Sequence, residues 1–236
     1  MSIELLERGA AALGALRQEV VFVGGATITL WITNPGAPPP RPTKDVDVIV
    51  EVTTRLGLHE FEARLRDAGF QEDRDSGVIC RWNHRDDPSL ILDAMPARAD
   101  LMGFVNRWQS ASLPYAEQRT LPSGIAIKAV PPPFLLGTKL EAHRGRGGHD
   151  LLTSHDLEDV IALIDGREEL VAEVQAAPPE LRSYVSTELE VLLMNQDFTY
   201  AISGLVRPDE ASQARIERWI LPRMRTMVET GPISGT

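Results

Sequence analysis

The chain has 236 residues, of which 43% are hydrophobic and 25% are charged, and this ordinary composition excludes collagen-like, disulfide-rich and wholly disordered proteins. With 24 Lys and Arg against 34 Asp and Glu, the formal net charge is −10, which argues against nonspecific coating of nucleic acid. No run of about 18 apolar residues is present, so we expect no membrane-spanning helix, and the single cysteine, Cys80, excludes an internal disulfide and favours the cytoplasm.

The first half of the chain alternates short β-branched runs with helical segments. Residues 1–19 are interrupted by polar side chains and lack the basic flank of a secretory signal, so they predict an amphipathic helix. Residues 54–68 carry apolar side chains at helical spacing, with a threonine available as the cap. Strands are predicted, in chain order, at residues 19–23, 46–52, 78–82, 90–95 and 125–130.

After the three prolines at 131–133 the pattern becomes helical. Helices are predicted at residues 134–144, 155–165, 180–206 and 211–228, with Ser154 as the cap of the second. Residues 35–42 are too rich in proline for a helix or a strand and predict a stiff surface loop. We therefore predict an α+β domain of residues 1–130 followed by a helical domain of residues 131–236.

A glycine pair, Gly24–Gly25, stands where the first predicted strand turns into an apolar helix. Such a turn lets the backbone approach a ligand, and the unpaired N–H groups at the start of a helix suit a phosphate. A glycine pair alone more often forms a tight turn without a ligand. Its interpretation therefore depends on the residues that follow it.

Three acids supply that context. Asp45 and Asp47 are two residues apart on a predicted strand and point to the same face. Like charges this close are unfavourable unless a cation neutralises them, and paired carboxylates suit a Mg²⁺ ion that also binds phosphates. Asp93 lies in an apolar run, where a carboxylate without a partner is unfavourable. If the two strands are neighbours, the three acids converge and could hold two metal ions. Taken alone, a pair such as Asp45 and Asp47 is more commonly a solvated strand edge, and Asp93 is as readily a loop-facing residue at a strand end.

The combination of Gly24–Gly25, then Arg41-x-Thr43-x-Asp45-x-Asp47, then Asp93 resembles the nucleotidyltransferase superfamily whose archetype is DNA polymerase β. Within it, the sequence is most similar to the abortive-infection type, the AbiEii-like nucleotidyltransferases, many of which are toxins of toxin–antitoxin pairs. The resemblance covers residues 21–164. The later matching residues are Lys139, Ala142, Arg144, Arg146, Asp156 and Asp159, with His155 where the family has a lysine.

The resemblance implies a mixed sheet of the nucleotidyltransferase fold with flanking helices, followed by the C-terminal helical module. It implies that Asp45, Asp47 and Asp93 ligate two Mg²⁺ ions, and that Asp93 helps to deprotonate the attacking hydroxyl. Gly24 and Gly25 would bring backbone amides to the β- and γ-phosphates. The other residues implied in nucleotide binding are Lys139, which would also act in catalysis, and Arg41, Thr43, Lys44, Arg144, Arg146 and Asp156.

The implied reaction is attack by an acceptor hydroxyl on the α-phosphate of an NTP such as ATP, with release of pyrophosphate. The acceptor would be RNA or a protein, and an antitoxin protein would be a possible partner. Two alternatives stay open: a small-molecule acceptor, as in antibiotic-modifying enzymes, and a non-catalytic nucleotidyltransferase fold that serves as an interaction module. A metal-dependent phosphohydrolase built on His143, His149 and His155 is a weaker alternative, because it leaves the three acids unexplained.

Overall fold

The computed structural model describes residues 2–98, 101, 106–146 and 151–229. The chain forms two compact units. The first unit comprises Met1–Leu30 and Pro42–Pro131, and the second comprises Trp31–Arg41 and Pro132–Thr236. The chain thus enters the second unit early, returns to the first, and only then completes the second. Nowhere in the described ranges does a helix have both the length and the apolar character needed to cross a membrane.

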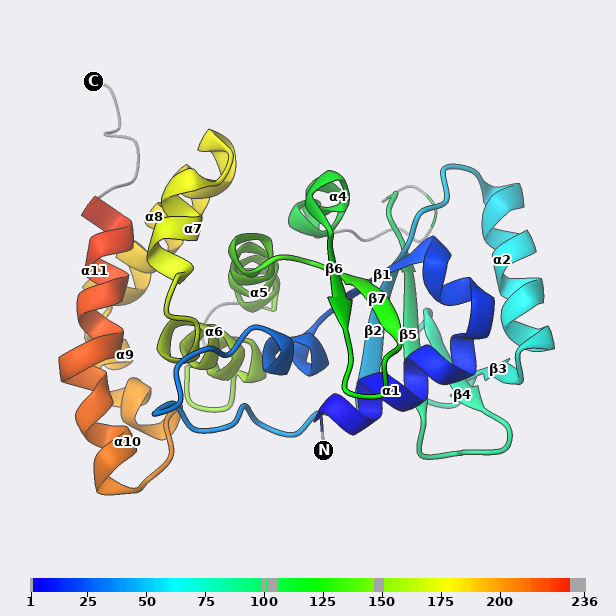
Figure 1. Cartoon of the computed structure of the whole chain (residues 1–236). Coiled ribbons are helices and arrows are strands. Elements are labelled where there is room, and N and C mark those ends of the chain that lie inside the picture. Colours follow the sequence, from blue (N-terminus) through cyan, green and yellow to red (C-terminus); the bar gives the residue numbers. More distant parts are fainter. Residues whose placement is uncertain (1, 99–100, 102–105, 147–150, 230–236) are drawn as a thin grey trace. The chain divides into compact units, whose positions relative to one another are not determined.

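The first unit is built on a mixed sheet, which among the described residues has seven strands in the order β3-β4-β5-β2-β1-β7-β6 (Figure 1). The strands are β1 (Val20–Val23), β2 (Asp45–Val50), β3 (Phe70–Glu72), β4 (Arg81–His84), β5 (Ile91–Pro96), β6 (Glu117–Thr120) and β7 (Ala126–Ala129). β2 runs parallel to β5, and β1 runs parallel to β7. The other neighbouring strands pair antiparallel.

Helices flank this sheet within the first unit. They are α1 (Ser2–Leu13), its 3₁₀ continuation η1 (Gly14–Glu19), the 3₁₀ helix η2 (Gly25–Leu30), α2 (Arg55–Asp67), α4 (Arg107–Ser112) and the 3₁₀ helix η3 (Leu113–Tyr115). α1 packs on the face of β2 that bears Val46, since a Cβ added at Gly9 would lie 3.1 Å from a Val46 methyl group. Successive side chains of a strand alternate between faces. The opposite face of β2 is therefore the one that carries Asp45 and Asp47.

The second unit consists of helices and the segment Trp31–Arg41. The helices are α5 (Pro132–Gly145), α6 (His155–Gly166), α7 (Leu170–Ala176), α8 (Pro179–Met194), α9 (Gln196–Ala201), the 3₁₀ turn η4 (Ile202–Gly204), α10 (Glu210–Arg215), the π-helical turn η5 (Ile216–Ile220) and α11 (Leu221–Glu229). α5 packs against α6 and α8, and α8 packs against α11. The Ser154 side chain caps α6 by accepting a hydrogen bond from the backbone N–H of Leu157, as predicted.

The segment Trp31–Arg41 forms no helix or strand, in keeping with its prolines. Its start is attached to the C-terminal end of α6. The backbone N–H groups of Thr33 and Asn34 both donate to the carbonyl oxygen of Gly166, at 2.8 and 2.9 Å. Ile32 lies so close to Gly166 that an added Cβ there would be 2.3 Å from Ile32 Cδ1. The segment therefore belongs to the second unit by both hydrogen bonding and packing.

The predicted α+β class is confirmed, with a mixed sheet, flanking helices and C-terminal helices. Several element boundaries were wrong. The strand expected at residues 78–82 begins at Arg81. The helix expected at 180–206 stops at Met194, and Asn195 then caps α9 by accepting a hydrogen bond from the N–H of Asp197. The apolar helix expected after Gly24 is a six-residue 3₁₀ helix.

Candidate functional site

One row of residues crosses four neighbouring strands and brings the predicted acids together. Val23 on β1 is paired with Asp47 on β2, Asp47 with Asp93 on β5, and Asp93 with Arg81 on β4. Paired residues on neighbouring strands project to the same face of a sheet. Asp45 shares that face because it lies two residues before Asp47. The three acidic residues that the sequence singled out therefore lie on one face of two neighbouring strands.

The guanidinium of Arg81 lies among these carboxylates. Its Nε and Nη2 atoms donate to the two oxygens of Asp93 at 2.8 and 2.7 Å, and Nη2 also donates to Asp45 Oδ2 at 2.9 Å. A bidentate pair of this kind is among the strongest contacts between an arginine and a carboxylate. The hydrogen bond to Asp93 raises the pKa of the Arg81 guanidinium above its ordinary value, against the effect of burial. Sequence reasoning missed Arg81, and the one signal for it was an arginine inside a predicted strand.

Gly24 makes room for one of the acids. Its φ angle is +81°, and an added Cβ would lie 1.9 Å from Asp47 Oδ2. The turn is closed by Thr27, whose backbone N–H and hydroxyl both donate to the carbonyl oxygen of Gly24, at 3.2 and 2.8 Å. Gly25 begins the short helix η2. In the structure, the turn at Gly24 leaves space for the Asp47 carboxylate. Phosphate binding by the backbone amides of Gly24 and Gly25 stays a prediction.

Thr43 and Lys44 lead into β2 beside the acids. The Thr43 hydroxyl oxygen is buried and has no hydrogen-bond partner among the residues that the structure describes. A buried hydroxyl in this state is unfavourable and marks a position where a bound molecule can supply the missing partner. Lys44 is exposed.

The pKa of the Cys80 thiol is affected by the same carboxylates. The thiol is free and buried. Burial is the largest cause that raises its pKa to about 12, and the nearby Asp93 and Asp47 carboxylates contribute to the same rise. A thiol with this pKa stays protonated at neutral pH, so Cys80 is a structural residue and not a nucleophile.

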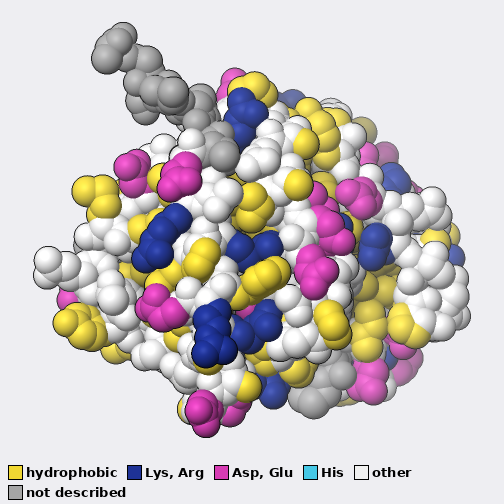
Figure 2. Space-filling model, turned by 60° about the vertical axis from the view of Figure 1, so that its left-hand side comes forward, with side chains coloured by type: hydrophobic (Ala, Val, Ile, Leu, Met, Phe, Trp, Pro, Cys, Tyr) yellow, Lys and Arg dark blue, Asp and Glu magenta, His cyan; other side chains and the backbone are white. Residues whose placement is uncertain are grey.

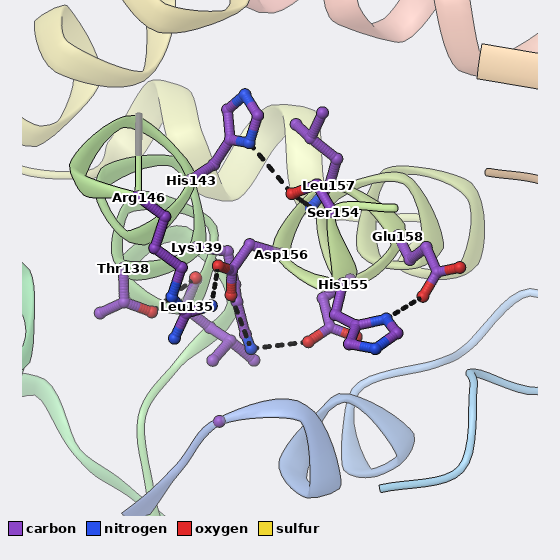
Figure 3. Close-up of polar contacts among 12 residues, drawn as sticks. Leu135, Thr138, Lys139, His143, Arg146, Ser154, His155, Asp156, Leu157 and Glu158 are labelled. Atoms are coloured by element: carbon purple, nitrogen blue, oxygen red, sulfur yellow. Dashed lines mark hydrogen bonds and ion pairs between the residues drawn. The ribbon is translucent and has the colours of Figure 1, made fainter. Parts of the chain in front are cut away.

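A second cluster lies in the second unit, at the start of α6. Asp156 and Asp159 are buried, with exposed fractions of 4% and 1%. Asp159 accepts two hydrogen bonds from Arg41, at 2.9 and 3.1 Å, and its Oδ2 lies 2.6 Å from Lys139 Nζ. Asp156 contacts Lys139 at 3.5 Å and also pairs with Arg146 (Figure 3). The structure thus groups three predicted phosphate-binding cations around two buried carboxylates.

Arg144 is not part of this second cluster. Its guanidinium pairs with Glu188 on α8 at 2.8 Å. It lines a mostly apolar cavity of about 390 Å³ between α5 and α8, together with Leu140, His143, Leu151, Thr187, Glu188, Val191, Leu192 and Asn195. Arg144 therefore lies apart from the other predicted cations of its unit.

The histidines of the hydrolase alternative do not gather at one point. His143 Nδ1 lies 3.0 Å from the Ser154 hydroxyl, and His155 Nδ1 lies 2.9 Å from Glu158 Oε2 (Figure 3). Each of these two rings is engaged by a different neighbour. His149 lies outside the described residues. Among the residues that the structure describes, no histidine belongs to a group of three or more side chains able to hold a metal ion.

The acids of the sheet offer oxygen donors for a divalent cation. Three carboxylates on adjacent strands are the hard oxygen donors that Mg²⁺ prefers. In the observed arrangement, however, Arg81 bonds two of them, and within the described residues no three His, Cys, Asp or Glu side chains converge as a metal-binding group. The donor set suits the ion in kind, and the ion would have to replace the contacts of Arg81.

Comparison with known proteins places the fold. No family model matches the chain, and no curated protein matches it. Among solved structures, it is similar to an antigenic nucleotidyltransferase-like protein from Paracoccidioides brasiliensis. The two are 19% identical, the match covers 86% of this chain and 92% of that chain, and the TM-score is 0.50. The likeness supports a nucleotidyltransferase fold, as predicted, while the AbiEii-like subfamily stays a prediction.

Proposed function

We propose that this protein is a Mg²⁺-dependent nucleotidyltransferase that moves NMP from an NTP to an acceptor hydroxyl. The observation that carries the proposal is the placement of Asp45, Asp47 and Asp93 on one face of two adjacent parallel strands. The glycine turn at Gly24 seats Asp47, and Thr43, whose buried hydroxyl is unsatisfied among the described residues, stands two residues before Asp45 in the chain. The nucleotidyltransferase-like fold agrees with this reaction class.

In the proposed reaction, the acceptor oxygen attacks the α-phosphorus of the NTP. A new P–O bond forms, the bond to the bridging oxygen breaks, and pyrophosphate leaves. Asp93, buried at the centre of the row, accepts the proton of the acceptor hydroxyl. Asp45, Asp47 and Asp93 would hold Mg²⁺, which when bound neutralises the triphosphate and activates the attacking oxygen. The Thr43 hydroxyl donates a hydrogen bond to the bound nucleotide.

The cations of the second unit are proposed to bind phosphate oxygens. Lys139 is 13% exposed and is held by both Asp156 and Asp159. A lysine fixed in this way keeps its charge in one place, which favours binding of a phosphate at a defined position. Arg41 and Arg146 are fixed by the same two carboxylates.

The acceptor is proposed to be RNA or a protein, as in AbiEii-like toxins, with an antitoxin protein as a regulatory partner. On the face shown in Figure 2, Lys and Arg side chains are interspersed with Asp, Glu and apolar side chains. One observation favours a non-catalytic interaction module instead, namely the pairing of Arg81 with Asp93 and Asp45.

Labelling tests the activity directly. The purified protein is incubated with each α-³²P-labelled NTP, Mg²⁺, and total cellular RNA and protein. We expect label on RNA or on a protein band, and we expect Asp45→Asn and Asp47→Asn to abolish it while the fold survives, because each removes a proposed metal ligand. Asp86→Asn removes an equal charge at an exposed position and is the matched control.

The outcomes separate the candidate functions. Label in the wild type and the control but in neither variant supports the enzyme. Retained label in either variant contradicts the assignment of these acids. Absence of label, together with no Mg²⁺-dependent thermal stabilisation by any nucleotide, supports the interaction module.

A further inference from the structure

Arg81 supplies the positive charge of the acidic row in this structure. Its backbone is fixed in β4 by pairing with β5, where Arg81 stands directly beside Asp93. Its side chain meets both oxygens of Asp93 and one oxygen of Asp45. Carboxylates on neighbouring strands repel one another unless a cation lies between them. Arg81 therefore offsets the negative charges of Asp45 and Asp93, which both bond its guanidinium.

The same oxygens are the ones that a divalent cation would need. A carboxylate bonded bidentately by a guanidinium presents both oxygens to the arginine and not to an ion. The guanidinium stays protonated at any physiological pH, so it can leave these oxygens only by rotation of its side chain. The Asp45 and Arg81 side chains are 33% and 20% exposed, against 10% for Asp93. A cation arriving from solvent therefore meets Asp45 and Arg81 before it meets Asp93.

We infer that Arg81 and a divalent cation are alternative partners of Asp93 and Asp45, so that Arg81 holds the site closed to metal until the ion displaces it. The identity of the ion rests on the proposed function. Arg81 is in this view a positioning residue, since it sets how tightly the acids bind metal without touching the reacting atoms. Its removal makes metal binding tighter, whereas removal of a metal ligand makes it weaker.

Mn²⁺ binding measured by calorimetry on the full chain tests this competition. Arg81→Gln keeps a polar side chain and removes the charge. We expect it to bind Mn²⁺ about tenfold more tightly than the wild type, the scale on which partners of metal-binding carboxylates alter affinity. Arg81→Lys keeps the charge without the bidentate fork and should fall between the two. Arg85→Gln removes an equal charge at an exposed position next to the end of β4 and should bind Mn²⁺ as the wild type does.

A thermal readout distinguishes competition from a purely structural role. In EDTA, Arg81→Gln should melt below the wild type, because Asp93 has lost its counter-charge. Added Mn²⁺ should restore most of the lost melting temperature, since the ion then does what Arg81 did. A melting temperature lowered equally with and without Mn²⁺, with unchanged Mn²⁺ affinity, would show that Arg81 only supports the sheet and would overturn the inference.

Mn²⁺ affinity and labelling together distinguish a failure of this inference from a failure of the proposed function. Mg²⁺-dependent labelling by the wild type, with equal Mn²⁺ affinity in wild type and Arg81→Gln, overturns the competition and leaves the function standing. No Mn²⁺ binding by either protein, together with no labelling by the wild type, overturns both. If Arg81→Gln does not fold, Arg81→Lys decides the matter, because equal Mn²⁺ affinity in that variant and the wild type overturns the competition.

Discussion

Gly24 has no side chain, and the Asp47 carboxylate occupies the space that a side chain would need. Gly24→Ala should therefore destabilise the protein for two reasons, the positive φ angle and the collision with Asp47. The φ angle alone costs about 1–2 kcal/mol, and the collision adds to it by moving Asp47. We expect a loss of more than about 2 kcal/mol in the free energy of unfolding, together with loss of nucleotide transfer, measured by chemical denaturation and by labelling.

Gly124 provides the control for this prediction. Its φ angle is +84°, close to that of Gly24, but an added Cβ would meet nothing within 4 Å. Gly124→Ala should show the effect of the backbone conformation alone and keep the activity. Equal losses of stability in the two variants, with activity retained in both, would mean that the contact between Gly24 and Asp47 is unimportant.

The site residues differ in how far the sequence could reveal them. Asp45 and Asp47 share a face because of strand alternation, which is a local property and can be predicted from their spacing. Their meeting with Asp93 depends on β2 and β5 being neighbours, which the sequence could only suggest through a family resemblance. Arg81 was missed because its position depends on the register between β4 and β5, and no pattern along the chain encodes that register.

At the level of elements, side chains of α10, the π-helical turn η5 and α11 form hydrogen bonds with the C-terminal end of α6. Asp165 is 3% exposed, and its Oδ1 accepts a hydrogen bond from Arg215 Nε at 2.6 Å. The indole N–H of Trp219 and the guanidinium of Arg223 donate to the carbonyl oxygens of Asp165 and Ile164. Carbonyl groups at the end of a helix have no partners within it. Side chains from the end of the chain thus complete the hydrogen bonding of α6.

Arg215→Ala should destabilise the second unit in a pH-dependent manner. Burial raises the pKa of the Asp165 carboxyl, and the hydrogen bond from Arg215 opposes that rise. Because the folded-state pKa is raised, stability falls as the pH increases from the unfolded value through the folded value. Without Arg215 the buried charge is less compensated, so the variant should lose about 2 kcal/mol near pH 7 and less near pH 4.5. Urea denaturation at both pH values checks this, and an equal loss at the two would contradict it.

Elements with weak patterns explain most of the differences between prediction and structure. β6 is largely exposed and β3 has only three residues, so neither shows the apolar alternation of a half-buried strand. The long helix expected at 180–206 is interrupted at Asn195, where a side-chain cap on Asp197 N–H competes with helix continuation. By contrast, Thr54 and Ser154 were recognised as caps, because capping depends on neighbouring residues alone.

At the scale of the whole molecule, Arg41 belongs to the second unit although the first unit resumes at the next residue. Its guanidinium bonds the almost fully buried Asp159. Arg41→Ala should leave that charge undercompensated and destabilise the second unit by about 2–3 kcal/mol. Hydrogen exchange should then be faster in α6, with β5 in the first unit unchanged. Faster exchange in β5 and none in α6 would contradict the assignment of Arg41 to the helical unit.

The attachment of Thr33 and Asn34 to Gly166 also fixes an order of events during synthesis. The segment that carries these residues leaves the ribosome more than a hundred residues before its partner does. At about 5–20 residues per second, the 133 residues from Asn34 to Gly166 take about 7–27 seconds to synthesise. The strands of the first unit can pair during that interval, while the segment still lacks its native contacts. The helical unit can therefore be completed only when the segment Trp31–Arg41, which is synthesised much earlier, binds to the end of α6.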